Sequence, residues 1–288
     1  MNEITLPQYQ SKEFGELPVW ELSDLYSGPE GDDLEAAFEE VARQVGVFAS
    51  SYDGIVEELD GELFGQAIVA YESISDLLGR IGSFAQLYQS QNIGDSDRGR
   101  FYQNTIDRMT TLSSRTLFFT LSINRLDDEA LEIKLSDPVA ARYRPWLRDL
   151  RVYKDHELSD ALERLLHEKY VTGRAAWTRL FDETEAGIRC AVDEEVLTLT
   201  EALNRLSDTK PERRKSAAKA IGNALGEKGS LFAYITNVMA KDKSIEDEWR
   251  KYPRPVSSRN MANLVEDEVV DALVAAAKCA YADTSYRY

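Results

Sequence analysis

The chain has 288 residues, of which 43% are hydrophobic and 30% are charged, and its formal net charge is −17. The hydrophobic content excludes a disordered chain, and the negative charge disfavours binding to nucleic acid or to anionic lipid. The longest uninterrupted apolar run, 272–277, is far shorter than the roughly 20 residues that cross a membrane as a helix.

The N-terminus and the cysteines bear on the compartment. The segment Met1–Pro7 has neither the basic region nor the apolar region of a signal peptide. The two cysteines, Cys190 and Cys279, are far apart and form no CxxC pair, as expected in a reducing compartment. We therefore expect a cytoplasmic protein without disulfides.

Three apolar stripes predict long helices in the first half, where no proline occurs between residues 30 and 137. In each stripe the spacing of three and four residues places the side chains on one helix face. The first stripe is Leu34, Phe38, Val41, Val45 and Phe48. The second is Ala67, Tyr71, Ile74, Leu78, Ile81, Ala85 and Tyr88. The third, taken as one continuing segment, is Tyr102, Ile106, Met109, Thr116, Phe119, Ile123 and Leu126.

Polar residues predict where these helices begin and end. Residues 51–54 end the first helix, Asp60 can cap the second, and residues 94–97 separate the second from the third. Short connections of this kind predict antiparallel helices packed side by side.

After Pro138 the predicted helices become shorter. Gly173 separates a leucine stripe, 158–166, from the next helix. The β-branched stretch 188–199 is split by a polar pair and predicts a small β-hairpin, which we also expect at a sub-domain junction. Further along, Pro211 suits a first helical turn.

Two more helices are expected near the end of the chain. One runs through Phe232 and Met239, residues 252–255 form a firm break, and the last stripe runs from Val265 to Ala280. The predicted fold class is thus all-α, with long antiparallel helices and one small β-hairpin near 188–199.

The zinc motif HExxH is incomplete in this sequence. His167-Glu168 starts such a motif, but the position of the second histidine is Val171. His156 is eleven residues earlier, about 16 Å away if one helix held both residues. Because one ion cannot bridge that distance, surface or capping roles are expected for both histidines.

Other catalytic and binding motifs are also incomplete. A di-iron bundle needs Glu-x-x-His twice, but Tyr153 and Arg164 stand at the glutamate positions. The glycine-rich run 222–230 lacks phosphate-loop spacing, and 95–97 lacks the rest of a calcium loop. Pairs of acidic residues are expected on solvated helix faces. We therefore assign no catalytic, cofactor-binding or metal-binding residue to this chain.

Several phrases, in order along the chain, resemble the oligoendopeptidase F branch of the thimet-oligopeptidase-like zinc metallopeptidases. They are LPVWELSDLY at 17–26, LSDALERLL at 158–166, GRAAWTRLFDE at 173–183, ITNVMAKDK at 235–243, RKYP at 250–253 and RNMAN at 259–263.

The resemblance implies a nearly all-helical cytoplasmic enzyme that cleaves short oligopeptides within a deep channel, with zinc held by HExxH and a downstream glutamate. Those zinc ligands would lie beyond the matching region. The expected domains are 1–60, an N-terminal segment with the first helix; 61–186, a helical lobe; and 187–288, the start of a peptidase domain cut off before the zinc motif. This chain would then form one wall of the channel, bind no zinc and be inactive without its C-terminal catalytic part.

Two alternatives remain open. The first is a self-contained helical interaction or scaffold protein without catalysis. The second is a stand-alone hydrolase that uses a pair of carboxylates. The uncovered apolar stripe from Val265 to Ala280 favours the peptidase interpretation over the scaffold, because no later element is available to cover it. The oligomeric state and the peptide preference do not follow from the sequence.

Overall fold

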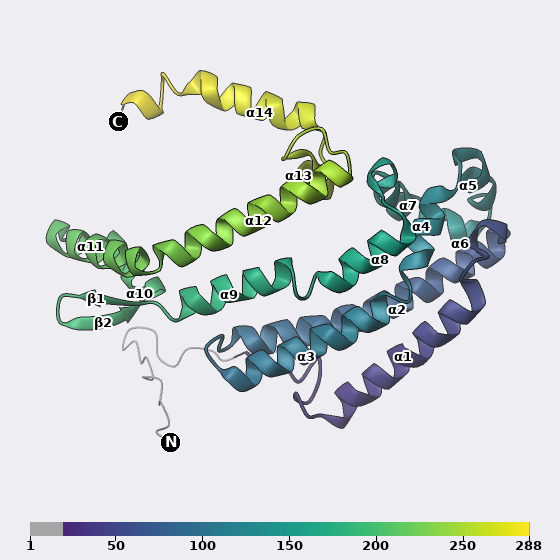
Figure 1. The fold of residues 1–288 in the computed structure, drawn as a ribbon, viewed down its shortest axis with the longest axis horizontal. Helices are drawn as coiled ribbons and strands as arrows, with labels where there is room; N and C mark the ends of the chain where they lie inside the picture. Colours follow the sequence, from purple (N-terminus) through teal and green to yellow (C-terminus); the bar gives the residue numbers. More distant parts are fainter. Residues whose placement is uncertain (1–19, 288) are drawn as a thin grey trace.

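The computed structural model describes residues 20–287, almost all of them in helices (Figure 1). The segment Met1–Pro7 and the first three residues of the 17–26 phrase lie outside this range. The α-helices are α1 (Asp32–Tyr52), α2 (Gly61–Ser90), α3 (Ser96–Ser113), α4 (Leu117–Arg125), α5 (Asp128–Lys134), α6 (Pro138–Ala141), α7 (Arg144–Arg151), α8 (Asp160–Lys169), α9 (Arg174–Ala186), α10 (Leu199–Asn204), α11 (Pro211–Glu227), α12 (Gly229–Trp249), α13 (Ser257–Ala262) and α14 (Asp267–Ala280). Short 3₁₀ turns are η1 (Val56–Glu58), η2 (Lys154–His156), η3 (Arg205–Ser207) and η4 (Ser285–Arg287).

The first three helices form a bundle whose core consists mainly of the predicted stripes. All five residues of the first stripe are buried in α1, and most of the second stripe is buried in α2. The short helices α4 to α7 close one end of the bundle (Figure 1). Gly65 lets α6 approach α2 closely, because a Cβ at this position would lie 2.9 Å from the backbone nitrogen of Ala140.

The predicted helix boundaries in this bundle are confirmed. The Asp60 side chain accepts a hydrogen bond from the Leu63 backbone N–H at 2.8 Å, which caps α2. Asp95 caps α3 by accepting from the N–H groups of Asp97 and Arg98. Each cap pairs N–H groups that have no partner within their helix.

The third stripe was wrongly expected as one continuous segment, since it is divided between α3 and α4. In the turn between the two helices, the hydroxyls of Ser113, Ser114 and Thr116 each donate to a backbone carbonyl three residues earlier. Such side-chain bonds compete with the helical ladder and favour its interruption. The turn redirects the chain, so that Phe119 packs in the bundle core.

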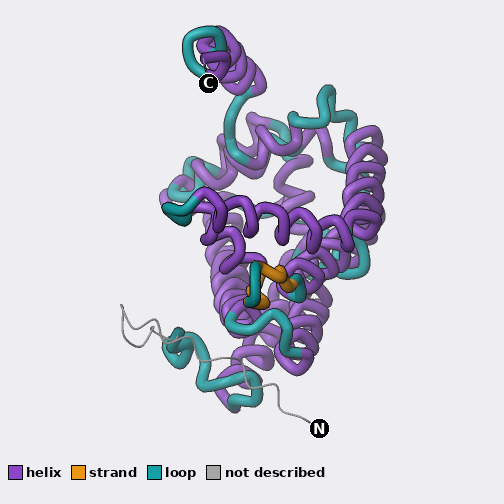
Figure 2. Tube along the Cα trace, turned by 90° about the vertical axis from the view of Figure 1, so that its left-hand side faces the viewer, coloured by secondary structure: helices purple, strands orange, loops and turns teal. Residues whose placement is uncertain are grey.

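The predicted hairpin is confirmed as β1 (Arg189–Val192) and β2 (Glu195–Thr198), the strands drawn in orange in Figure 2. The strands pair antiparallel, with Cys190 opposite Leu197. Both of these side chains are buried in a second, smaller core together with α10 and α11. The all-α fold with one small hairpin is therefore as predicted.

The helices α8, α9 and α12 connect the two cores (Figure 1). Helix α12 runs beside α9, where the ring centroids of Phe181 and Phe232 are 5.2 Å apart. Beyond α13 the chain turns back and α14 projects from the rest of the molecule, with Leu273 70% exposed. Val265 precedes α14, although it was expected within the last helical stripe.

The division into 1–60, 61–186 and 187–288 stays a prediction. Within residues 20–287, no helix combines the length and the apolar character needed to cross a membrane.

Candidate functional site

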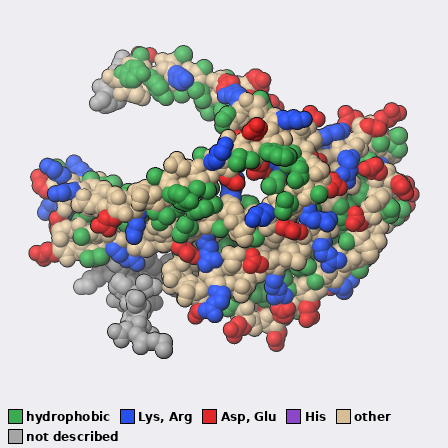
Figure 3. All heavy atoms as spheres, viewed as in Figure 1, with side chains coloured by type: hydrophobic (Ala, Val, Ile, Leu, Met, Phe, Trp, Pro, Cys, Tyr) green, Lys and Arg blue, Asp and Glu red, His purple; other side chains and the backbone are tan. Residues whose placement is uncertain are grey.

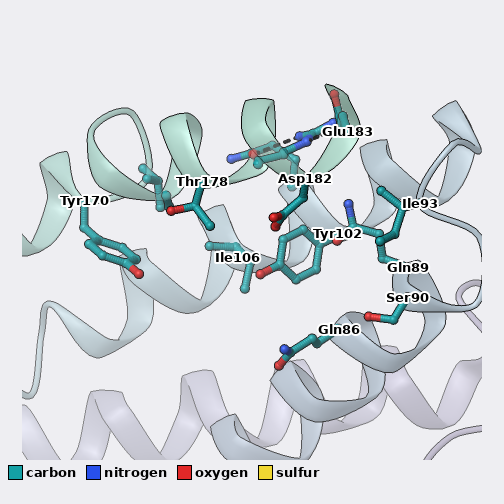
Figure 4. Close-up of a pocket in the computed structure, with 14 residues that line it drawn as sticks. Gln86, Gln89, Ser90, Ile93, Tyr102, Ile106, Tyr170, Thr178, Asp182 and Glu183 are labelled. Carbon is teal, nitrogen blue, oxygen red and sulfur yellow. Dashed lines mark hydrogen bonds and ion pairs between the residues drawn. The ribbon is translucent and has the colours of Figure 1, made fainter. Parts of the chain in front are cut away.

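A cleft of about 230 Å³ lies where α2 and α3 meet the end of α8 and the start of α9 (Figure 4). The lining is mainly polar and aromatic. It consists of Gln86, Gln89, Ser90, Ile93, Tyr102, Gln103, Ile106, Tyr170, Val171, Ala175, Thr178, Arg179, Asp182 and Glu183. Because its walls come from separate helices, the packing of α9 against the bundle determines its shape.

Arg179 holds α9 against α3 at one side of this cleft. Its Nε donates to Glu183 Oε1 at 2.7 Å, one turn along α9, and its Nη1 donates to Gln103 Oε1 at 3.1 Å, across on α3. Gly99 makes room for the guanidinium, because a Cβ there would lie 3.1 Å from Arg179 Nη2. The positive charge of Arg179 is thus balanced by Glu183.

Asp182 and Tyr102 face each other inside the cleft, and the Asp182 carboxylate points toward the Tyr102 ring (Figure 4). Partial burial raises the pKa of the Asp182 carboxyl. Burial also raises the pKa of the Tyr102 phenol, Tyr170 raises it further, and the opposing effects of Arg179, which lowers it, and Asp182, which raises it, are smaller. In residues 20–287, no hydrogen bond or ion pair engages the Asp182 carboxylate.

The two histidines lie apart on η2 and α8, and each contacts a different element. His167 is half-buried, and its Nε2 lies 2.8 Å from the Ser113 hydroxyl at the end of α3. Burial lowers the pKa of the His167 imidazole. The ring of His156 stacks on Tyr252 at 4.2 Å between centroids, and its Nδ1 lies 2.7 Å from the carbonyl oxygen of Arg250. Both rings therefore take part in packing between helices.

The residues present do not fit the zinc ion that the family resemblance implies. In the part of the chain from 20 to 287, no three His, Cys, Asp or Glu side chains come together as a metal cage requires. The assignment of no catalytic or metal-binding residue stays a prediction, and we derive no metal chemistry from these side chains.

A mostly buried ion pair joins α8 to the end of α12. Arg250 donates two parallel hydrogen bonds to the Glu163 carboxylate, at 2.6 and 2.9 Å, and these side chains are 16% and 12% exposed. Arg250 Nη1 also donates to the carbonyl of His156. Bidentate pairing of this kind fixes both position and orientation, so it aligns α12 relative to α8.

Neither Tyr102 nor Asp182 was predicted from the sequence as a candidate site residue. Tyr102 belongs to a helical stripe and was expected to pack in the core, whereas it is only partly buried and lines the cleft. Asp182 is one acidic residue among 51. The two are 80 positions apart, and no local spacing rule links residues at that distance.

Two sequence comparisons with known proteins each match part of this chain. The family model described as Oligopeptidase F matches residues 122–189, which include α8 and α9. A curated relative, the oligoendopeptidase F homolog of Borreliella burgdorferi, is 23% identical over 109 residues, which are 38% of this chain and 18% of the relative.

Two solved structures share the fold. Oligoendopeptidase-F from Enterococcus faecium matches with a TM-score of 0.74 and 18% identity, over 84% of this chain and 49% of that one. A putative peptidase from Chlamydophila abortus matches with a TM-score of 0.58 and 16% identity, over 91% of this chain and 45% of that one. The chain thus spans about half the length of these solved chains, and a smaller part of the curated relative.

Proposed function

We propose that this chain, which is related to the N-terminal part of oligoendopeptidase F, forms one wall of the substrate channel in a zinc-dependent oligopeptide endopeptidase. The observation that carries the proposal is the fold match with the Enterococcus faecium enzyme, which extends over 84% of this chain but only 49% of that one. In this proposal the zinc ligands and the general base come from polypeptide outside this chain.

Exposed apolar side chains support a partner for the later helices. Trp249 is 60% exposed at the end of α12, and Leu273 and Val269 are 70% and 54% exposed on α14. Figure 3 shows hydrophobic side chains gathered along the seam of α9 and α12 and on α14. Since large apolar surface is costly to expose to water, we propose that the catalytic part of the enzyme covers α12 and α14.

The channel gives a steric reason for preferring short peptides. Long helices joined by packed cores form a stiff wall, and a narrow channel admits an extended peptide but excludes a folded domain.

We propose a cytoplasmic setting, which is supported by the two free cysteines, one buried and one exposed.

The proposal is tested by two activity assays on fluorescence-quenched peptides, each with and without a metal chelator. The purified chain of residues 1–288 should show no zinc-dependent cleavage and no stoichiometric zinc binding. The product of the complete reading frame from which the chain derives should cleave short peptides and lose this activity with chelator. Zinc-dependent turnover by residues 1–288 alone would refute the proposal that the zinc ligands and the general base come from polypeptide outside this chain. A reading frame that ends at codon 288, with a monodisperse inactive product, would favour the scaffold alternative.

A further inference from the structure

The cleft between α3 and α9 carries one unbalanced negative charge. Three charged side chains line it, and two of them, Arg179 and Glu183, form an ion pair with each other. The third is Asp182, which has no ion-pair partner in the described part of the chain. A ligand that enters the cleft therefore meets a net charge of −1, and Arg179 already uses two of its five N–H donors on Glu183 and Gln103.

The remaining lining suits a cation with several N–H donors. The rings of Tyr102 and Tyr170 present aromatic surfaces, which attract cations through their quadrupoles. Gln86, Gln89 and Thr178 offer side-chain oxygens as acceptors. Figure 4 places the Tyr102 ring between Asp182 on one side and Gln86 on the other, so acceptors approach the cleft from opposite helices.

An ammonium group matches these features better than other ions do. It has three donors that point in different directions, which suits acceptors supplied by different helices. A single free carboxylate is too few ligands for a divalent metal, in line with the lack of any three-residue metal cluster within residues 20–287. An anion would be repelled by Asp182, and the positive charge of Arg179 that could attract it is already balanced by Glu183.

We propose that this cleft binds an alkylammonium group of an oligopeptide, either its α-amino group or a lysine side chain, with Asp182 as the counter-charge and Tyr102 and Tyr170 as aromatic walls. The peptide origin of the ligand rests on the proposed function, whereas the preference for ammonium rests on the cleft alone. The Tyr102 ring is partly buried, whereas Asp182 and Tyr170 are exposed at the mouth of the cleft, where a ligand can reach them. A bound cation would stabilise the ionised carboxylate, so binding weakens as Asp182 becomes protonated at low pH.

The chemistry is tested with n-butylammonium as the probe, titrated into the 288-residue chain and followed by NMR chemical shifts. Neutral n-butanol is the matched ligand control. The variant Asp182→Asn should weaken n-butylammonium binding about tenfold, the loss expected for one charge-assisted contact. Glu185→Gln is the matched protein control, because it removes one negative charge from the same helix at an exposed position outside the cleft.

Three outcomes would overturn the ammonium site. Equal weakening by Asp182→Asn and Glu185→Gln would mean that the cation follows only the net charge of the chain. Equal binding of n-butanol would mean that charge plays no part. If both Tyr102→Leu and Asp182→Asn kept the full affinity for n-butylammonium, the probe would bind outside this cleft. Tyr102→Leu gives a second test if Asp182→Asn alters folding, which circular dichroism would reveal.

The peptide source is tested separately with one lysine-containing peptide and two modified forms. Loss of binding on N-acetylation assigns the α-amino group, and loss on replacing lysine by norleucine assigns the side chain. Binding of all three peptides alike would refute an ammonium-directed peptide site. Because these experiments measure binding to the 288-residue chain and not turnover, a failure here is distinguishable from a failure of the proposed peptidase function.

Discussion

Breaking the ion pair between Glu163 and Arg250 should loosen the attachment of α12 to α8. In Glu163→Gln the side-chain size is kept, but the Arg250 guanidinium loses its bidentate partner while it stays 16% exposed. Fully buried pairs cost about 3–5 kcal/mol when one partner is removed, and exposed pairs contribute about 0.2–1 kcal/mol. For this mostly buried pair, in which Glu246 remains as a second partner of Arg250, we expect a loss of about 2 kcal/mol.

Hydrogen exchange measured by mass spectrometry gives a local readout of this loss. The backbone N–H groups of Arg250 and Tyr252 donate to carbonyls of α12 at 2.9 Å each, so their exchange reports opening of its last turn. Where the exchange rate follows the equilibrium between the closed and open forms of this turn, a loss of about 2 kcal/mol corresponds to about thirtyfold faster exchange.

Glu246→Gln is the matched control for this experiment. Glu246 binds the same arginine at 2.7 Å, but its side chain is 47% exposed. Exposed pairs one turn apart contribute about 0.5 kcal/mol or less, so exchange should rise only about twofold. Similar exchange rates in the two variants would refute the argument that burial gives the Glu163 pair its larger contribution.

Three further predictions concern the two cores and the packing between helices. Burial lowers the pKa of His167 from its ordinary 6.5, so below that pH the unfolded chain takes up a proton that the folded chain resists. The free energy of unfolding should therefore fall as the pH drops below about 6.5. Urea titrations at several pH values should show a smaller fall in His167→Gln. The same dependence of the unfolding free energy on pH in both proteins would contradict this reasoning. A thiol reagent should modify exposed Cys279 quickly in the native chain but not buried Cys190, whose pKa is raised by burial, and Cys279→Ser should abolish the fast phase. Phe119→Ala, at a fully buried ring, should lower the free energy of unfolding by about 3–5 kcal/mol in urea titrations followed by circular dichroism. A loss below about 1 kcal/mol would show that the core around this ring readily collapses or is not formed.

The sequence by itself determined the helices, their caps and the hairpin, because these features depend on neighbouring residues. Asp60 and Asp95 cap helices through N–H groups within three positions, and an apolar stripe repeats at every turn. The same local reasoning failed between α3 and α4, where hydroxyls of Ser113 and Thr116 bond to the backbone and interrupt the apolar repeat. The family resemblance also came from local phrases.

Only the tertiary structure brought together Tyr102 and Asp182, or Glu163 and Arg250. These partners are 80 and 87 positions apart, and each residue alone has several plausible roles on a helix surface. Their contacts depend on how α9 and α12 pack against other helices, which is set by many small apolar contacts summed over whole faces. A periodic stripe states that a helix face will be buried but does not specify its partner, so no pattern along this chain could predict the cleft or the ion pair.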